Sequence, residues 1–512
     1  MDNLALASPE IFLLSAACAV LVVGLFVDAE RQLVYWLSQA TLVVTLFLAF
    51  SQIGGVDVSG AAASEEAAVG ERLRASMTAF TGAYAVDAMS ATLKSWLLVV
   101  VLGVLLYSRD YLSERRIARG EYYVLVLFAV AGMMIMVSGQ NLLTVYLGLE
   151  LLALSQYAMV ALLRDDGRAS EAAMKFFVLG SLASGMLLYG MSMVYGASGS
   201  LDLGVIRETL ALGGLDRDPD AVGNAVALTS GFDERAVGAR FGLVFIVVGI
   251  AFKLGAVPFH MWVPDVYEGA PTSVTMFIST APKLAAFAML IRLLVDGLEV
   301  LNADWQQMLA ILSALSMIVG NLVAIAQTNV KRMLAYSTIS HVGFLLMGIV
   351  GAGPAGYSAA MFYAITYAFT TLAAFGVLLA LSRGGHEAVT LDDLAGLARR
   401  NTLLAVVMLL AMISLAGVPP TVGFYAKLVV LKAAIGAGYT WLAILGVIMS
   451  VIGAFYYLRI VKLAFFDEPA PLSAEVATAG DVTAGLAVNG LAVVVLGVFP
   501  GLVMTACLAA FA

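Results

Sequence analysis

The sequence has few of the residues from which soluble redox enzymes build their sites. Its 512 residues include two cysteines and three histidines, and 12% of the chain is charged, against about 25% in ordinary soluble domains. Cys18 and Cys507 lie near opposite ends, and no CxxC or CxxCH motif is present. These scarcities exclude a disulfide framework and an iron–sulfur ligand set, and we expect no cofactor in this chain.

Basic residues are also scarce. The formal net charge is −8, and the lysines and arginines lie in short loops or inside apolar segments. No basic stripe of the kind that neutralises phosphates is present, which excludes nucleic acid as a partner.

Hydrophobic residues, by contrast, make up 62% of the chain. Apolar runs of about 20 residues, long enough for a spanning helix, recur from end to end. We count about fourteen of them and predict an all-α polytopic membrane protein. The first run follows no basic n-region and precedes no small-residue cleavage site, so we expect it to be retained as a helix.

The charges in the loops predict the orientation. Loops after odd-numbered helices carry about fourteen lysines and arginines, and the remaining loops carry about eight. Because basic residues are retained on the cytoplasmic side, we expect both termini to lie on the outer side.

Two stretches of similar sequence interrupt the apolar pattern. Residues 252–265 read FKLGAVPFHMWVPD, and residues 415–427 read LAGVPPTVGFYAK. Proline has no backbone N–H and clashes with the carbonyl four residues earlier. The prolines expected to break the helices are Pro258, Pro264, Pro419 and Pro420. We therefore predict that helices seven and twelve are discontinuous, with water at the freed carbonyls.

The two stretches also suggest an internal repeat. Aligning Gly255 with Gly417 aligns Pro258 with Pro420, five helices apart, and an odd separation gives the second copy the opposite orientation. The alternative is a chance match of two common residues. The predicted units are residues 1–121 (helices 1–3), 122–300 (first inverted repeat, helices 4–8), 301–466 (second inverted repeat, helices 9–13) and 467–512 (helix 14).

Six ionisable residues lie inside the apolar segments. Each would cost about 2.5–3.5 kcal/mol at a helix centre, so such residues face the interior, pair or meet water. Two of them lie nearer helix ends, where a lysine can extend to the membrane surface: Lys94 and Lys175. The central ones are Glu150, Lys253, Lys283 and Lys427.

Lysine in these positions favours a proton relay, because a buried lysine can lose its proton and an arginine cannot. The alternative is a structural ion pair, which could account for one lysine. His260 follows Lys253 by seven residues and could bridge two lysines through water. His341 lies on a polar helix face, as part of a water path or as a satisfied core histidine. With one central carboxylate, no binuclear metal site is expected.

The stretch from Phe252 to Trp262, followed by Pro264 and Asp265, resembles the signature of the antiporter-like membrane subunits of respiratory complex I, the proton-translocating NADH:quinone oxidoreductase. The resemblance covers nearly the whole chain. The sequence PDVYEGAPTSVT from Pro264, followed by Ala281-Pro282-Lys283, is similar to the N branch of that family. Lys427 departs from the M branch, where a glutamate is expected. The L branch has a long lateral helix that this chain lacks.

This resemblance implies roles for the central residues. It implies that Glu150 pairs with Lys253, that Lys283 is the central relay, and that Lys427 belongs to a second half-channel. His260 would lie on the hydrated path. Lys175 matches a lysine in the family's sixth helix.

The resemblance also implies an assembly. The partners would be other complex I membrane subunits, including a second antiporter-like subunit and small membrane subunits, in the lipid of a bacterial inner membrane. FMN, iron–sulfur clusters and quinone would belong to the complex as a whole. Two alternatives remain: a sodium/proton antiporter subunit of a multi-subunit cation antiporter, and a quinone-binding structural subunit.

Overall fold

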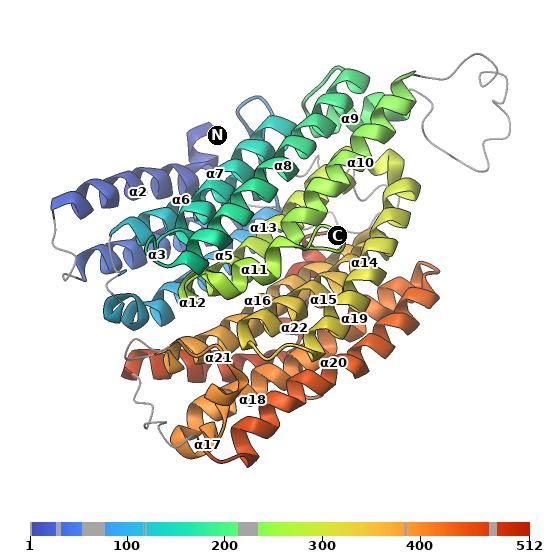
Figure 1. Ribbon diagram of the computed structural model, residues 1–512. Coiled ribbons are helices and arrows are strands. Elements are labelled where there is room, and N and C mark those ends of the chain that lie inside the picture. The colour runs from blue at the N-terminus through green and yellow to red at the C-terminus, as the bar shows by residue number, and fades with distance from the viewer. Residues whose placement is uncertain are drawn as a thin grey trace.

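The computed structural model describes residues 3–26, 32–53, 77–115, 117, 120–212, 234–382, 387–469 and 479–511. Figure 1 shows long helices packed roughly side by side. The helices up to the first break are α1 (Asn3–Leu6), α2 (Ser8–Phe26), α3 (Leu33–Ile53), α5 (Ala88–Glu114), α6 (Gly120–Ser138), α7 (Leu142–Val160), α8 (Gly167–Ser198), α9 (Leu203–Leu210) and α10 (Glu234–Leu254).

The remaining helices run from the first break to the C-terminus. They are α11 (Trp262–Gly269), α12 (Thr272–Ser279), α13 (Ala281–Leu290), η4 (Ile291–Gly297), η5 (Glu299–Leu301), α14 (Asn302–Ile325), α15 (Val330–Val350), α16 (Gly353–Leu381), η6 (Leu391–Leu394), α17 (Leu397–Arg400), α18 (Thr402–Ala416), α19 (Val422–Gly436), α20 (Thr440–Phe466), α21 (Gly480–Val498) and α22 (Gly501–Ala509).

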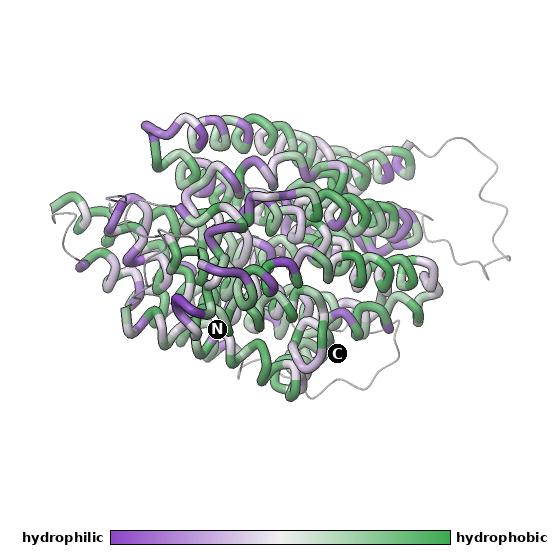
Figure 2. Tube along the Cα trace, turned by 60° about the horizontal axis from the view of Figure 1, so that its bottom comes forward, coloured by the Kyte–Doolittle hydropathy of each residue, from purple (hydrophilic) through white to green (hydrophobic). Residues whose placement is uncertain are grey.

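The number of spans agrees with the prediction. In the described part of the chain, 13 helices are long and apolar enough to cross a membrane. The remaining predicted span, 401–431, is divided between α18 and α19. Figure 2 shows hydrophobic residues along most of the helices, with shorter hydrophilic stretches between them. The all-α polytopic prediction is therefore confirmed for the spans.

A short antiparallel hairpin departs from the all-α prediction. Strands β1 (Met77–Ala79) and β2 (Tyr84–Val86) pair through three residue pairs. The turn between them contains positive φ angles at Phe80, Thr81 and Gly82. Strands of three residues are too short to give a hydrophobic period, so the sequence pattern could not reveal them.

Three central segments form the core of the bundle. In the most apolar 18-residue stretch of the spans at 272–297, 330–350 and 353–381, 100%, 94% and 94% of the residues are buried, against 28% for the span at 8–26. In Figure 1, α13, α15 and α16 lie between the early helices and the group formed by α18, α19 and α20. Residues on these central helices are therefore shielded from lipid.

Both predicted helix breaks are present. α10 ends at Leu254 and α11 begins at Trp262, while α18 ends at Ala416 and α19 begins at Val422. Gly255 and Gly417 end the first halves with φ angles of 81° and 85°, a left-handed conformation that glycine adopts without steric cost. The peptide bonds before Pro258 and Pro420 are cis. The division into two inverted repeats stays a prediction.

Candidate functional site

Glu150 and Lys253 line one cavity between α7, α8 and α10. The cavity also contacts Ser184 and Tyr157, and has room for one or two water molecules. The Ser184 hydroxyl donates a hydrogen bond to the Glu150 carboxylate. Glu150 therefore already has a partner on α8.

Lys253, which also lines this cavity, is bound by a neutral partner. Its ammonium donates to the Gln156 side-chain carbonyl at 3.2 Å. Lys253 lies within range of an electrostatic interaction with the Glu150 carboxylate, but these two described residues form no ion pair. The direct Glu150–Lys253 pair that the resemblance implies is therefore open in this structure, with each member held by a different polar side chain.

Lys283 closes the first helix break. Its ammonium donates to the carbonyl of Leu254 at 2.7 Å, the carbonyl that Pro258 frees from helical bonding. Lys283 is 3% exposed and lies 5.5 Å from the centre of the Trp262 ring. A partner of this carbonyl is thus a buried lysine, and the expectation of water at the break stays a prediction.

Other side chains complete the hydrogen bonding of the first break. The Trp262 indole donates to the Phe252 carbonyl at 2.9 Å. The Val257 backbone N–H donates to the Ser316 hydroxyl at 2.9 Å. The break is therefore held by a side chain of the following half-helix, α11, and by one of α14.

Lys427 has the same role at the second break. Its ammonium donates to the carbonyls of Leu415 and Ala416 at 3.0 and 2.9 Å and to the Ser450 hydroxyl at 2.8 Å. The side chain is 7% exposed, so it faces the protein interior. Each broken helix thus has its free carbonyls bound by a buried lysine.

His341 is enclosed by tyrosines in the second half of the chain. Its Nδ1 lies 2.6 Å from the Tyr363 hydroxyl and its Nε2 lies 3.0 Å from the Tyr457 hydroxyl. Tyr457 in turn lies 2.5 Å from the Ser337 hydroxyl. His341 is therefore a hydrogen-bonded core histidine.

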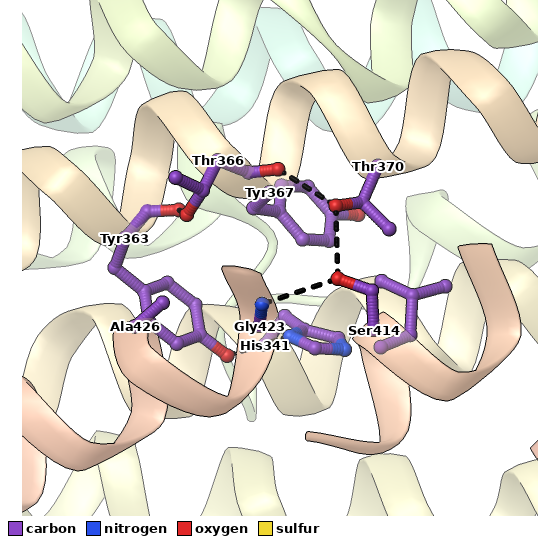
Figure 3. A pocket seen from close by; sticks show the side chains of 9 residues that line it. His341, Tyr363, Thr366, Tyr367, Thr370, Ser414, Gly423 and Ala426 are labelled. Carbon is purple, nitrogen blue, oxygen red and sulfur yellow. Dashed lines mark hydrogen bonds between the residues drawn. The ribbon is translucent and has the colours of Figure 1, made fainter. Parts of the chain in front are cut away.

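The same histidine also lines a cavity, shown in Figure 3. The cavity has room for about one water molecule. Hydroxyls continue along its wall, because Thr370 and Ser414 lie 3.3 Å apart. The wall includes Leu415, whose carbonyl binds Lys427. The wall of this cavity therefore extends from His341 to the second break, and a role of this histidine in a water path stays a prediction.

Residues 139–453 match the family described as NADH:quinone oxidoreductase/Mrp antiporter, TM. NADH-quinone oxidoreductase subunit N of Thioalkalivibrio sulfidiphilus (strain HL-EbGR7) is 53% identical over 498 residues, which cover 97% of this chain and 96% of the relative. The chain belongs to the subunit N family. That finding confirms the predicted resemblance to the N branch.

Solved structures agree with the family. A chain of respiratory complex I from Thermus thermophilus with bound aureothin is 31% identical, with a TM-score of 0.78 over 98% of this chain and 100% of that one. A chain of the Mrp complex from Dietzia sp. DQ12-45-1b is 20% identical, with a TM-score of 0.75 over 99% and 96% of the two chains. The second likeness shows a shared fold.

Among the described residues, two other predicted site residues form no hydrogen bond with the lysines described above. His260 is in the first break, and its Nδ1 has no hydrogen-bond partner among the described residues. Lys175 is 43% exposed and forms ion pairs of 2.8 Å with Glu171 and Asp265. Within this subunit N chain, Lys175 therefore belongs to a charged cluster at a helix end.

Lys94 corrects the expectation that it extends to the membrane surface. It is fully buried, 2.6 Å from the Glu10 carboxylate, and donates to the Tyr84 hydroxyl at 2.8 Å. Glu10 lies on α2, near the start of the chain, and the sequence pattern did not predict it as the partner of Lys94. The pair belongs to packing of the N-terminal helices and not to the central group.

Sequence reasoning missed several polar residues of the site. The charged and basic side chains described above form hydrogen bonds with four uncharged ones: Gln156, Ser184, Tyr363 and Tyr457. The available signal was a polar side chain within an apolar helix, six residues after Glu150 in the case of Gln156. In this chain, uncharged polar side chains inside apolar helices therefore also belong to the site.

Proposed function

We propose that this chain is a proton-translocating membrane-arm subunit of an NADH:quinone oxidoreductase (complex I). Protons would move through Glu150, Lys253, Lys283, His341 and Lys427, driven by quinone reduction elsewhere in the complex. The enzymatic activity would belong to the whole complex, with this chain as a subunit without a redox centre.

One observation carries the proposal: the lysines that close both helix breaks are buried and uncompensated by carboxylates. Lys283 and Lys427 bind backbone carbonyls and form no ion pair within the described part of the chain. A buried ammonium without a counter-charge is costly, and lysine can relieve that cost by releasing its proton. A purely structural role would be served as well by a neutral donor.

The mechanism follows from the open Glu150–Lys253 arrangement. While the carboxylate is near, its negative charge favours the protonated lysine. When the carboxylate turns to Ser184, Lys253 retains the neutral acceptor Gln156, and burial then favours transfer of its proton. Lys283 is the electrostatic neighbour of Lys253 and is the proposed acceptor. Water in the cavities would connect the steps.

The proposed setting is the bacterial inner membrane, with both termini on the outer side. The proposed partners are a second antiporter-like subunit, small membrane subunits of the same complex, and lipid. FMN, iron–sulfur clusters and quinone would be held elsewhere in the complex. A sodium/proton antiporter remains the alternative, and sodium-dependent proton movement would reveal it.

Substitution of Lys283 tests the relay. Lys283→Arg keeps a cationic donor for the Leu254 carbonyl but cannot release its proton, whereas Lys283→Ala removes both. We expect both variants to assemble and to lose most coupled proton transport, measured as protons moved per NADH oxidised in membrane vesicles. Normal pumping in Lys283→Ala would disprove the relay. Pumping retained in Lys283→Arg but lost in Lys283→Ala would favour the structural role.

A further inference from the structure

The second half of the first broken helix is a short segment whose position depends on its neighbours. α11 has eight residues, which correspond to a length of about 12 Å. An isolated helix of this length is only marginally stable. α11 packs against α8 on one side and α15 on another, so contacts with these two helices determine where it lies.

One carboxylate of α11 is bound by both neighbouring helices. The Lys175 ammonium, on α8, donates to Oδ2 of Asp265 at 2.8 Å. The Arg332 guanidinium, on α15, donates to Oδ1 of the same residue at 2.8 Å. Asp265 therefore joins three helices and uses both of its carboxylate oxygens to do so.

The ion pairs continue beyond Asp265 with alternating charge. Glu171 lies 2.8 Å from Lys175, and Glu268 lies 2.9 Å from Arg332. The five side chains are partly exposed, from 31% to 66%, and exposed pairs contribute little to overall stability. Each cation also keeps a second carboxylate if Asp265 becomes neutral. A neutral residue at position 265 should therefore leave the protein folded.

The other end of α11 belongs to the first helix break. Its first residue, Trp262, stacks on Phe176 with ring centres 4.6 Å apart and an angle of 14° between the planes. Phe176 directly follows Lys175 on α8. α8 therefore holds α11 at two neighbouring points, by the ring stack at Trp262 and by the ion pair at Asp265, and the Trp262 ring in turn lies 5.5 Å from the Lys283 ammonium.

We propose that Asp265 is a positioning residue for the relay. Bound to Lys175 and Arg332, it fixes the half-helix α11 and thereby holds the Trp262 ring beside Lys283. The carboxylate itself exchanges no proton in this role. The proposal rests on the proposed function, because it concerns the surroundings of the central lysine. A purely structural ion pair would instead affect assembly and leave the transport of each assembled complex unchanged.

The test measures proton transport per assembled complex in membrane vesicles. Asp265→Asn keeps the shape of the side chain and removes its charge. We expect normal assembly and an about fivefold loss of transport, since a displacement of about 1 Å can cost up to roughly 10²-fold at a reacting centre. Asp265→Glu keeps the charge and should retain most of the transport.

The matched control is a carboxylate of equal exposure in another ion pair. Asp304, on α14, is 32% exposed and lies 3.2 Å from Arg240 on α10, whereas Asp265 is 31% exposed. Asp304→Asn removes an ion pair of the same kind that does not involve α11. We expect this variant to assemble and to transport protons normally.

A double variant tests whether Asp265 acts through Trp262. Trp262→Leu removes the ring that Asp265 is proposed to position, and we expect it to lower transport per assembled complex. Adding Asp265→Asn to Trp262→Leu should cause no further loss, because effects of residues that act through one another are not additive. Losses that multiply in the double variant would contradict the proposal.

The remaining outcomes separate the two proposals. Normal transport in Asp265→Asn, with transport lost in Lys283→Ala, would overturn the positioning role alone. Normal transport in Lys283→Ala would overturn the proposed function itself. Failure of Asp265→Asn to assemble, while Asp304→Asn assembles, would show that Asp265 only holds helices together. Equal losses in Asp265→Asn and Asp265→Glu would show that the charge is not what positions α11, and would also overturn the proposal.

Discussion

Gln156 gives the cavity at Lys253 a property that a carboxylate could not. An amide carbonyl accepts a hydrogen bond from the ammonium at 3.2 Å without supplying a full counter-charge. Gln156 is 1% exposed, and its own amide nitrogen has no partner among the described residues. Because Gln156 is neutral, Glu150 is the nearby carboxylate whose charge would favour the protonated form of Lys253.

A charge at position 156 should therefore trap the proton. Gln156→Glu would place a permanent anion beside Lys253, and we expect coupled proton transport to fall while the complex still assembles. Gln156→Met, which is neutral but cannot accept a hydrogen bond, should be milder. Protons moved per NADH oxidised in vesicles give the comparison. If Gln156→Glu pumped better than Gln156→Met, a neutral partner would not be what this position requires.

At the scale of the helix, the breaks depend on two glycines. Gly417 has a φ angle of 85°, and a Cβ there would lie 2.7 Å from Cδ of Lys427. Gly255 has a similar angle, and its Cβ would lie 2.7 Å from the Val263 side chain. The short loop and the lysine stem are therefore packed too closely to admit a methyl group.

Gly417→Ala should displace Lys427 from the carbonyls of the second break. The strained angle alone costs about 1–2 kcal/mol, and the clash adds to it, so we expect less assembled complex and reduced proton transport. Gly185→Ala is the matched control: this glycine is inside α8 with nothing within 4 Å of the added atom, and alanine should be neutral or stabilising by roughly 0.5–1 kcal/mol. Native gels and transport assays read out both variants. Equal behaviour of the two variants would contradict the tight fit.

Helices and breaks could be predicted because each corresponds to a local sequence pattern. A run of about 20 apolar residues predicts a span, and proline within it predicts a break, as at Pro258 and Pro420. The partners across the bundle could not be predicted so. Lys283 binds a carbonyl 29 residues away, and Lys94 binds Glu10 from another helix, because tertiary packing chooses which polar groups meet. The small hairpin at 77–86 is too short to leave a pattern.

For the molecule as a whole, buried ion pairs attach the N-terminal helices to the rest. Lys94 on α5 contacts Glu10 on α2 at 2.6 Å. Arg292, on η4 and also fully buried, contacts Asp87 at the start of α5 at 2.8 Å. The two pairs therefore link α2, α5 and the end of the eighth span.

Breaking one of these pairs should affect stability and leave transport intact. Lys94→Met would leave a buried carboxylate without its counter-charge, a loss of about 3–5 kcal/mol, and should lower the melting temperature of the complex. The double variant Glu10→Gln with Lys94→Met should recover much of that loss. The proton-to-electron ratio of the assembled complex should stay normal, since neither residue belongs to the proposed proton relay. A changed ratio would place Lys94 in the relay.

The bonds from Lys283 to Leu254 and from Lys427 to Ala416 have one more consequence. In each, a single hydrogen bond belongs both to an ionisable side chain and to the backbone of a broken helix. Protonation of the lysine and movement of the half-helix are two equilibria that share this hydrogen bond, so they are coupled reciprocally. The free energy by which protonation favours one helix position equals the free energy by which that position favours protonation. A displacement of either half-helix would therefore change the proton affinity of its lysine, and protonation of the lysine would shift the position of the half-helix.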